Sequence, residues 1–472
     1  MAYEYDLVIL GGGTAGYVAA IKASQLGLKT AIVEKENLGG TCLHKGCIPT
    51  KSMLKSAEVA YSMRNADLYG ISSVAPEIDM SKIQGRKQEV VDRMHGGVRH
   101  LMKKYKVDIF RGHGRILGPS IFSPMAGTVA VEHPEDEEAE SEILVNQHVL
   151  IATGSHPRPL PFLPFDHDVV LSSDDMMSLD HIPPRMAIIG GGVIGLEFAS
   201  MLTDLGSEVT VIEAGDHIIP LEDKDIATQL KKSLEARGVI FKIGSALDES
   251  RIDRQEASIT LKLDDGDASF DKVLVAIGRA PNTDDLGLAN TKIRLDNGYI
   301  ETNEYYQTKD AHMYAVGDVI GNLQLAHVAT KEAIAAVEHM ADENPYPLDY
   351  NGVPRCIYTY PEVAAIGMTE QALKQQGIDH SAHKVPFAAV GKAVISHGDK
   401  GFGKILIDPK TKDILGVSLI GPGATELINE AALAKFLDAS ALELGSAIHA
   451  HPSIGEVLME LGLDAEGKGI HV

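Results

Sequence analysis

The sequence predicts an α/β protein with two Rossmann-like dinucleotide-binding domains and a C-terminal α+β domain. Two observations predict the Rossmann-like pair: a buried strand runs into a glycine-rich turn at 11–16, and the same pattern returns at 190–195. The third observation is that residues 353–472 contain no such turn and alternate strands with helices. Prolines between 157 and 164 and a charged segment at 342–350 indicate the domain crossings.

The first turn has the spacing of a dinucleotide-binding motif. Gly11 permits the tight turn, Gly13 lets a pyrophosphate approach the backbone, and Gly16 lets the helix pack on the strand. The N-terminus of that helix faces the phosphates. Glu34 ends the next strand, where it is placed to accept hydrogen bonds from a ribose hydroxyl. The predicted elements are a strand at 5–10, a helix through Leu26 and a strand at 30–33.

The second turn repeats the first at a constant offset of 179 residues. Because the glycines, the strand, the helix and the terminal acid all keep register, we predict a second dinucleotide site with its own acid at Glu213. A carboxylate there accepts a hydrogen bond from a free ribose 2′-hydroxyl and repels a 2′-phosphate. This site is therefore expected to prefer NAD(H) to NADP(H). The matched positions are Gly11 and Gly190, Gly13 and Gly192, Gly16 and Gly195, and Glu34 and Glu213.

Two of the three cysteines, Cys42 and Cys47, follow the first turn. Residues five apart on a regular helix are separated by about 8–9 Å at Cα, which is too far for a disulfide. Gly46 and Pro49 give the segment the means to bend. A cysteine pair beside a redox cofactor suggests a reversible disulfide, and two unlinked thiols are the simpler alternative. From the spacing alone both interpretations remain open.

Three further strands end in small or acidic residues. We predict them at 149–155, 272–281 and 312–318, followed by a helix at 326–340. Small residues let a ligand approach the backbone, and open α/β sheets bind ligands at the carboxyl ends of their strands. Asp318, at such an end, is therefore expected to contact a cofactor.

A motif near the C-terminus contains His449, His451, Pro452 and Glu456. Proline favours the first turn of a helix, so Pro452 is predicted to begin the final helix, with His451 exposed at its start. An imidazole oriented by a carboxylate is the arrangement that a general base needs near neutral pH. The alternative is a surface histidine or a metal ligand, and the motif taken alone favours this alternative over the general base.

The composition excludes several classes of function. The formal net charge of −23 argues against nucleic acid and anionic membranes as the main partners, and would suit a basic protein partner. Three cysteines in 472 residues exclude a disulfide scaffold and fit a reducing compartment. The chain has no apolar run of membrane-spanning length and no targeting segment, so we expect a soluble, cytoplasmic protein.

Together these motifs resemble the FAD-dependent, two-dinucleotide disulfide oxidoreductase family over the whole chain. The matching motifs include Gly-Gly-Thr-Cys-x4-Cys-Ile-Pro-x-Lys at 39–51, Ala-Thr-Gly-Ser at 152–155, Ala-Ile-Gly-Arg at 276–279, Tyr-Ala-Val-Gly-Asp at 314–318 and His-x-His-Pro-x4-Glu at 449–456. The resemblance implies an FAD-binding domain at 1–150, an NAD-binding domain at 151–280, a central domain that completes the FAD site at 281–350 and a C-terminal dimerisation domain at 351–472.

The resemblance also implies an activity, the oxidation of protein-bound dihydrolipoamide to lipoamide with reduction of NAD⁺ to NADH. His451, oriented by Glu456, would deprotonate the dithiol, Cys42 would form the mixed disulfide, and Cys47 would face the flavin. The implied FAD contacts are Gly11, Gly13, Gly16, Glu34, Lys51, Gly114, Asp318 and Ala326. The implied NAD contacts are Gly190, Gly192, Gly195, Glu197, Glu213 and Gly278.

The partners implied by the resemblance are a second copy of the chain and a lipoyl-bearing complex. The latter would be the lipoyl domains and acyltransferase core of a 2-oxo acid dehydrogenase complex, or the lipoyl carrier of glycine cleavage. We expect no metal, because His44 between the cysteines has no second ligand pair. The alternatives are a glutathione-, mycothiol- or mercuric-reductase-like enzyme, or a non-catalytic role in the complex. Glu213 and the absence of cysteine near the C-terminus argue against the glutathione and mercuric alternatives.

Overall fold

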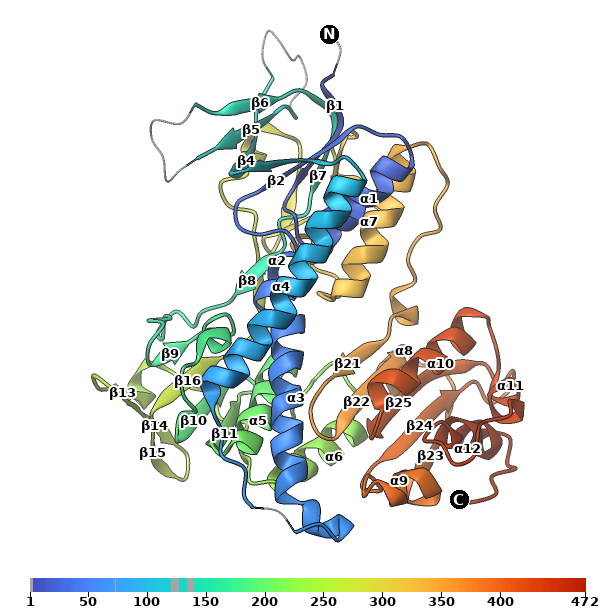
Figure 1. The fold of residues 1–472 in the computed structure, drawn as a ribbon. Coiled ribbons are helices and arrows are strands. Elements are labelled where there is room, and N and C mark those ends of the chain that lie inside the picture. The colour runs from blue at the N-terminus through green and yellow to red at the C-terminus, as the bar shows by residue number, and fades with distance from the viewer. Residues whose placement is uncertain (1–2, 73, 120–126, 134–139) are drawn as a thin grey trace. The chain divides into compact units, whose positions relative to one another are not determined.

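The chain folds into two compact units, each assembled from three segments, and we describe each unit by itself (Figure 1). The first unit comprises Met1–Ser52, Lys82–Arg158 and Arg279–Leu348, and the second Met53–Ser81, Pro159–Gly278 and Asp349–Val472. Two long helices, α3 (Cys47–Arg64) and α4 (Met80–Lys104), continue from one unit into the other. This structure is a computed structural model, and it describes residues 3–72, 74–119, 127–133 and 140–472.

The first unit is built on a five-stranded parallel sheet with the strand order β20-β7-β1-β2-β3. In its centre, Leu10 of β1 lies opposite Val33 of β2 on one side and Ile151 of β7 on the other. Such near-continuous apolar runs are typical of parallel strands that are covered on both faces. The strands are β1 (Tyr5–Leu10), β2 (Thr30–Glu34), β3 (Asp108–Arg111), β7 (Asn146–Ile151) and β20 (Met313–Ala315).

Two helices of the first unit, α1 (Thr14–Gln25) and α7 (Ala326–Met340), pack side by side (Figure 1). Each follows a parallel strand, so both helices begin at the carboxyl edge of the sheet, where open α/β folds bind their ligands. The unit also contains a short helix and several antiparallel strands. These are α2 (Gly40–His44), the sheet of β4 (His113–Ile116), β5 (Val129–Glu132) and β6 (Glu142–Leu144), and the pairs β8 (Ser155–Pro157) with β17 (Arg279–Pro281) and β18 (Leu295–Asp296) with β19 (Tyr299–Ile300).

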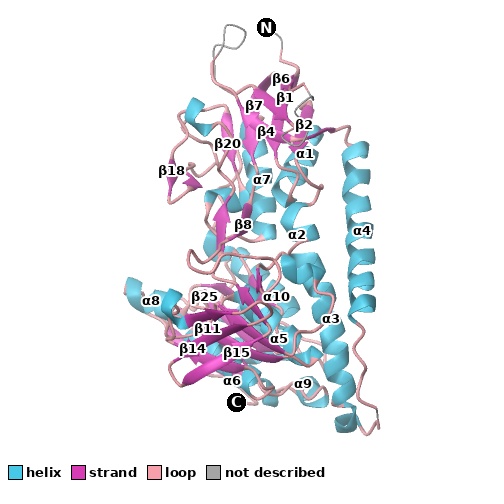
Figure 2. Cartoon of the chain, turned by 90° about the vertical axis from the view of Figure 1, so that its left-hand side faces the viewer, coloured by secondary structure: helices cyan, strands magenta, loops and turns pink. Residues whose placement is uncertain are grey.

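The second unit repeats this architecture with a parallel sheet in the order β12-β11-β10-β16-β9. Helix α5 (Val193–Leu205) follows β10 as α1 follows β1, and α6 (Lys224–Glu235) follows β11. The parallel strands are β9 (Val170–Leu171), β10 (Arg185–Ile189), β11 (Glu208–Glu213), β12 (Ile240–Ile243) and β16 (Lys272–Val275). An antiparallel meander adds β13 (Ile252–Arg254), β14 (Ile259–Leu263) and β15 (Gly266–Phe270) (Figure 2).

The C-terminal part of the second unit is an antiparallel sheet in the order β21-β22-β25-β24-β23, as its alternating strands and helices predicted. Its core is apolar and includes Ile405, Leu419 and Leu461. The strands are β21 (Arg355–Ile357), β22 (Glu362–Gly367), β23 (Ser381–Pro386), β24 (Phe402–Ile407) and β25 (Ile414–Gly421). The helices are α8 (Glu370–Gln376), α9 (Gly391–Ile395), α10 (Ala424–Phe436), α11 (Ala441–Ser446) and α12 (Glu456–Ala465).

Four predicted element boundaries are wrong. The strand expected at 149–155 ends at Ile151, and the strand expected at 312–318 ends at Ala315. The strand expected at 272–281 is divided into β16 and β17, because Gly278 between them adopts a φ of +112° that interrupts an extended chain. The final helix begins at Glu456 and not at Pro452, which lies in the preceding turn. Among the residues that the structure describes, no helix combines the length and the apolar character needed to cross a bilayer.

Candidate active site and cofactor sites

The first glycine turn has the geometry of a nucleotide cradle. Gly11 has a φ of +98°, and a Cβ there would lie 2.4 Å from the carbonyl oxygen of Ala152. A Cβ on Gly16 would lie 1.9 Å from the carbonyl oxygen of Gly11, so both positions require glycine. At Gly13 the nearest atom to a Cβ would be 3.8 Å away, which leaves the space that an approaching pyrophosphate needs.

The acid at the end of β2 is tied to this turn. One carboxylate oxygen of Glu34 accepts a hydrogen bond from the backbone N–H of Gly12 at 2.6 Å, and the other accepts one from Glu36 at 2.6 Å. These bonds fix the carboxylate beside the glycine turn. A ribose seated against the turn therefore meets an acceptor that is already oriented.

The second turn reproduces this arrangement bond for bond. Glu213 accepts hydrogen bonds from Gly191 and Gly215, each at 2.6 Å, which are the counterparts of Gly12 and Glu36 at the offset of 179 residues. A Cβ on Gly195 would lie 2.2 Å from the carbonyl oxygen of Gly190, whereas one on Gly192 would meet no atom within 4 Å. The repeat seen in the sequence therefore extends to the individual hydrogen bonds of the structure.

The two cysteines lie on either side of a break between two helices. Cys42 is in α2, which ends at His44, and Cys47 is the first residue of α3. The bend that the spacing required is therefore present, and it brings the thiol of Cys42 into hydrogen-bond contact with that of Cys47. Both cysteines are thiols in this structure.

The two cysteines lie in different electrostatic surroundings. The hydrogen bond with Cys47 and then burial raise the pKa of the Cys42 thiol, and a hydrogen bond from Thr14 and the charge of Lys51 oppose the rise only in part. Cys42 therefore retains its proton when the pair loses one. Cys47 lies at the N-terminus of α3, where the helix dipole stabilises a negative charge.

Ser155, Arg279 and Asp318, in the region predicted to bind the cofactor, form a hydrogen-bond network that the sequence did not predict. The Oγ of Ser155 donates a hydrogen bond to Asp318 at 2.5 Å and accepts one from the Nε of Arg279 at 2.7 Å. Gly317, beside Asp318, donates its N–H to the carboxylate of Glu332, which is 1% exposed. Ser155 and Arg279 end two of the motifs noted above, and that position is the one signal by which they could have been found.

Two other predicted FAD contacts, Ala326 and Gly114, lie in the first unit, one at the start of a helix and the other where a strand packs closely on its neighbour. Ala326 is the first residue of α7, whose N-cap residue, Leu325, makes no side-chain cap hydrogen bond, and a helix N-terminus favours an anionic ligand. Gly114 is in β4, where a Cβ would lie 2.6 Å from the side chain of Leu10. These features, together with the open space at Gly13, fit a bound dinucleotide.

The C-terminal histidine pairs with its predicted carboxylate in the second unit. The Nδ1 of His451 lies 2.8 Å from Oε1 of Glu456, and the histidine side chain is 77% exposed. A second pair, His449 with Glu430 at 2.7 Å, was not anticipated, and its histidine side chain is only 8% exposed. The exposed imidazole is the one that can reach a substrate.

The remaining predicted NAD contacts also belong to the second unit. Glu197 of α5 is 4% exposed and accepts a hydrogen bond from the backbone N–H of Tyr358. Gly278 has an unobstructed Cβ position. The structure thus gathers Gly190, Gly192, Gly195, Glu197, Glu213, Gly278, His451 and Glu456 in the second unit, and Gly11, Gly13, Gly16, Glu34, Cys42, Cys47, Lys51, Gly114, Asp318 and Ala326 in the first.

These features define an enzyme that passes electrons between thiols and nucleotide cofactors. The family model of the pyridine nucleotide-disulphide oxidoreductases matches residues 5–333, and the model of their dimerisation domain matches residues 353–461. The chain therefore belongs to the pyridine nucleotide-disulphide oxidoreductase family. It is an oxidoreductase with FAD and NAD as cofactors, as the two glycine turns indicate.

The chain is similar to several proteins over its full length. It is 51% identical to a dihydrolipoyl dehydrogenase of Bacillus subtilis, with 100% of both chains covered, and 37% identical to that of Zymomonas mobilis over the same share. Among solved structures, LpdA of Mycobacterium tuberculosis has a TM-score of 0.89 at 27% identity, covering 97% of this chain and 99% of that one. The flavoprotein disulfide reductase RclA of Escherichia coli has a TM-score of 0.83 at 26% identity, covering 97% and 99%.

Proposed function

We propose that the chain oxidises protein-bound dihydrolipoamide to lipoamide and transfers the two electrons to NAD⁺. The observation that carries the proposal is the pair of cysteines at the break between α2 and α3, with their thiols in hydrogen-bond contact and Cys47 at a helix N-terminus. The similarity to dihydrolipoyl dehydrogenases along the entire chain supports the substrate. Bound FAD supplies the two-electron relay between the cysteine pair and the nicotinamide.

In the proposed first half-reaction, the oxidised protein holds a Cys42–Cys47 disulfide. A thiolate of the substrate attacks the sulfur of Cys42, the bond between the two cysteine sulfurs breaks, and Cys47 leaves as a thiolate. The second thiolate of the substrate then attacks the first substrate sulfur, which breaks the mixed disulfide, releases lipoamide and returns Cys42 as a thiol. The raised pKa of Cys42 supports this order, because the proton then settles on Cys42 and the charge on Cys47.

His451 is the proposed base for the substrate thiols. Glu456 holds Nδ1, so Nε2 of the exposed ring is left to accept a proton. The match of residues 353–461 to a dimerisation domain supports a homodimer, in which this histidine would serve the cysteine pair of the other subunit. Lys51 and Glu197 are proposed to contact the flavin and the nicotinamide.

We also infer the wider setting of the reaction. Lipoyl groups are carried by the acyltransferase core of 2-oxo acid dehydrogenase complexes or by the carrier protein of glycine cleavage, and one of these is the proposed partner. The acidic composition, with a formal net charge of −23, supports docking of a basic partner domain. A reducing, cytoplasmic location agrees with the three cysteines.

The test is turnover of dihydrolipoamide with NAD⁺ by the variant Cys42→Ser. We expect this variant to retain its flavin absorbance and to lose activity by at least about 10³-fold, since serine cannot form the mixed disulfide. Cys356→Ser, which changes the third cysteine in β21, is the matched control and should keep its activity. Substantial turnover by Cys42→Ser would refute the assigned role of the pair.

A further inference from the structure

The loop that follows β11 in the second unit returns to the second glycine turn before it enters α6. Strand β11 ends at Glu213 and α6 begins at Lys224, so the loop comprises residues 214–223. The backbone N–H of Ile219 donates a hydrogen bond to the carbonyl oxygen of Gly191 at 2.8 Å. The N–H of Gly191 itself is bonded to the carboxylate of Glu213. The backbone of Gly191 is therefore held on both sides, at its N–H by the acid and at its carbonyl by the loop.

The bond from Ile219 orients the position that is expected to meet the pyrophosphate. The carbonyl of Gly191 and the N–H of Gly192 belong to one planar trans peptide, so they point in opposite directions. Because the carbonyl is bonded to Ile219, the N–H of Gly192 is directed away from the loop. The space beside Gly192 is open, since a Cβ there would meet no atom within 4 Å. The loop thus sets the direction of a backbone donor in the predicted dinucleotide site.

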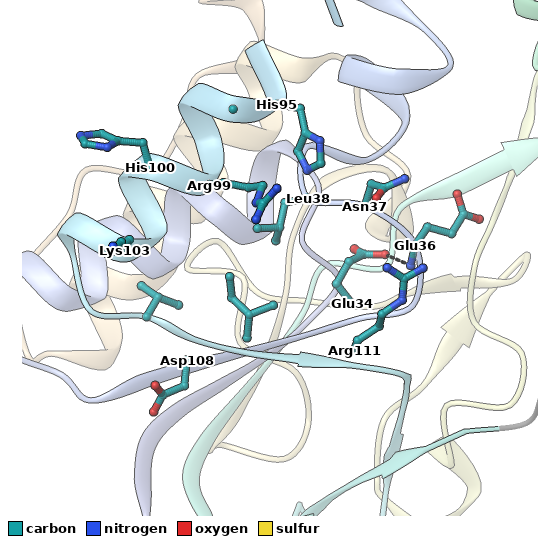
Figure 3. A pocket seen from close by; sticks show the side chains of 13 residues that line it. Glu34, Glu36, Asn37, Leu38, His95, Arg99, His100, Lys103, Asp108 and Arg111 are labelled. Carbon is teal, nitrogen blue, oxygen red and sulfur yellow. Dashed lines mark hydrogen bonds between the residues drawn. The ribbon is translucent and has the colours of Figure 1, made fainter. Parts of the chain in front are cut away.

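Ile219 makes this bond in a strained backbone conformation. Its φ is +41°, a value that β-branched residues rarely adopt. In the first unit the corresponding loop begins at Glu34, which accepts a hydrogen bond from the N–H of Glu36 (Figure 3). There the carbonyl of Gly12 is bonded at 2.8 Å by the N–H of Gly39, whose φ of +106° is accessible to glycine. A strained residue keeps its conformation only where the surrounding structure holds it. The loop after β11 therefore depends on a support that glycine makes unnecessary in the first unit.

The support is a buried ion pair near the end of the loop. Glu222 is 5% exposed, and its carboxylate accepts hydrogen bonds from Nε of Arg355 at 2.8 Å and from Nη2 at 3.1 Å. Arg355 lies in β21 and also donates to the carbonyl oxygen of Gly367 in β22 at 3.2 Å. The N–H of Glu222 in turn donates to the carbonyl oxygen of Ile219 at 2.9 Å. Burial raises the pKa of Glu222, and the bonds and charge of Arg355 oppose that rise. A two-point pair between planar groups fixes orientation as well as distance, so the C-terminal sheet holds the loop close to Ile219.

We propose that Arg355 is a positioning residue for NAD(H), which acts on the second glycine turn through Glu222 and Ile219. The inference rests on the proposed binding of NAD(H) at this turn. Arg355 lies 133 residues beyond Glu222 and within the part of the chain that matches the dimerisation domain, so that domain contributes to nucleotide binding as well. A preformed turn binds its ligand without the cost of being ordered at that moment. Loss of the ion pair therefore weakens NAD⁺ binding and leaves the chemistry of the cysteine pair unchanged.

The test is a calorimetric titration of the oxidised, FAD-saturated protein with NAD⁺, which cannot reduce the flavin. We expect Arg355→Met to raise the Kd for NAD⁺ by about fivefold or more, because the turn must then be ordered on binding. Glu222→Gln, which keeps the size of the side chain and removes its charge, should raise the Kd by a smaller factor and serves if Arg355→Met does not fold. In turnover, the KM for NAD⁺ should rise while kcat and the KM for dihydrolipoamide stay at the parental values. Amide hydrogen exchange in residues 214–222 should be faster in either variant than in the parent. An unchanged Kd or unchanged exchange would overturn the proposal.

Two further variants separate positioning from a general loss of stability. Arg237→Gln breaks another buried ion pair of the second unit, that with Asp204, and is the matched control. It should lower Tm and leave the Kd for NAD⁺ unchanged, and equal weakening by Arg237→Gln and Arg355→Met would contradict the assigned role. Gly192→Ala changes the turn itself. If it does not weaken NAD⁺ binding, the assignment of the nucleotide site fails; if it does and Arg355→Met does not, the inference about Arg355 alone fails.

Discussion

His451 and Glu456 form a hydrogen-bonded pair in which Nδ1 of the imidazole lies 2.8 Å from Oε1 of the carboxylate. The bond to His451, followed by one from the backbone N–H of Ser453, lowers the pKa of Glu456. The carboxylate therefore stays charged at neutral pH. It holds the proton of the neutral ring on Nδ1, which leaves Nε2 as the acceptor.

This pair predicts that His451→Gln slows turnover without affecting the fold. Since a general base contributes about 10²–10⁴-fold, we expect a loss of kcat/KM in that range for dihydrolipoamide with NAD⁺. Flavin absorbance and Tm should match those of the parent, because His451 is exposed. The measurement is steady-state kinetics across pH, in which the variant should lose the limb that depends on a basic group.

His449→Gln is the matched control for that experiment, since it also changes a histidine paired with a carboxylate, two residues away. His449 is nearly buried against Glu430, so we expect its replacement to lower Tm and to leave kcat/KM of the folded protein nearly unchanged. If His449→Gln rather than His451→Gln abolished turnover, the two histidines would have been assigned the wrong way round.

The second glycine turn yields a prediction about two glycines that differ only in their surroundings. A methyl group on Gly192 meets no atom within 4 Å, whereas one on Gly195 would lie 2.2 Å from a backbone oxygen. Gly192→Ala should therefore keep the parental Tm and raise the KM for NAD⁺ by about tenfold or more, because the methyl group enters the space of the pyrophosphate. Gly195→Ala should instead lower Tm. Thermal denaturation with and without NAD⁺ distinguishes the two effects.

The carboxylate of Glu213 predicts the choice of nicotinamide cofactor. Replacement by glutamine removes the charge that repels a 2′-phosphate and weakens the hydrogen bond to the ribose. We expect Glu213→Gln to lower kcat/KM for NAD⁺ by about tenfold and to narrow the preference over NADP⁺, the cost of one charged hydrogen bond being about 1.5–3 kcal/mol. Glu208→Gln, at the exposed start of the same strand, should change neither value.

The parts of the fold that the sequence predicted are those that depend on local pattern. The glycine spacing and the apolar runs correctly predicted the first strand, the helix and the second strand of both parallel sheets. The bend between Cys42 and Cys47 was predicted because a regular helix would hold them too far apart for a disulfide. The network of Ser155, Arg279 and Asp318 could not be found in this way. Its members are 124 and 163 residues apart, and one sequence contains no information on which distant side chains meet.

The local helix propensity of proline also led to a wrong prediction for the start of the last helix. Proline is favoured in the first turn of a helix, yet α12 begins four residues after Pro452. The carboxylate of Glu456 accepts a hydrogen bond from the backbone N–H of Ser453. This bond joins the first residue of the helix to the preceding turn and fixes where the helix starts. The site residues themselves were foreseen by motif, and their roles in catalysis remain predictions for the experiments above.

A buried ion cluster in the second unit was not foreseen either, because strand periodicity does not reveal that β24 is covered on both faces. Lys404 is 1% exposed, and its ammonium group donates to Asp223, Asp225 and Glu370. Burial alone would lower the pKa of Lys404, but the hydrogen bonds to these carboxylates outweigh it and raise that pKa to about 12. Lys404→Met should therefore destabilise the fold by roughly 3–5 kcal/mol, since it leaves the buried Asp223 without its cation. Chemical denaturation at pH 7 measures this.

The same cluster predicts the sign of the acid dependence of stability. Hydrogen bonds from Lys374 and then Lys404 lower the pKa of Glu370 to about 2, whereas a carboxyl in the unfolded chain titrates near about 4.3. The contribution of Glu370 to stability is fully present above the pKa of the carboxyl in the unfolded chain. It is lost as the pH falls from about 4.3 toward about 2. In Lys404→Met the hydrogen bond from Lys374 remains, so Glu370 keeps only part of its lowered pKa, and the loss of unfolding free energy below about pH 4.3 should be smaller than in the parent. Parallel slopes in parent and variant would show that Lys404 does not hold these acids in their charged form.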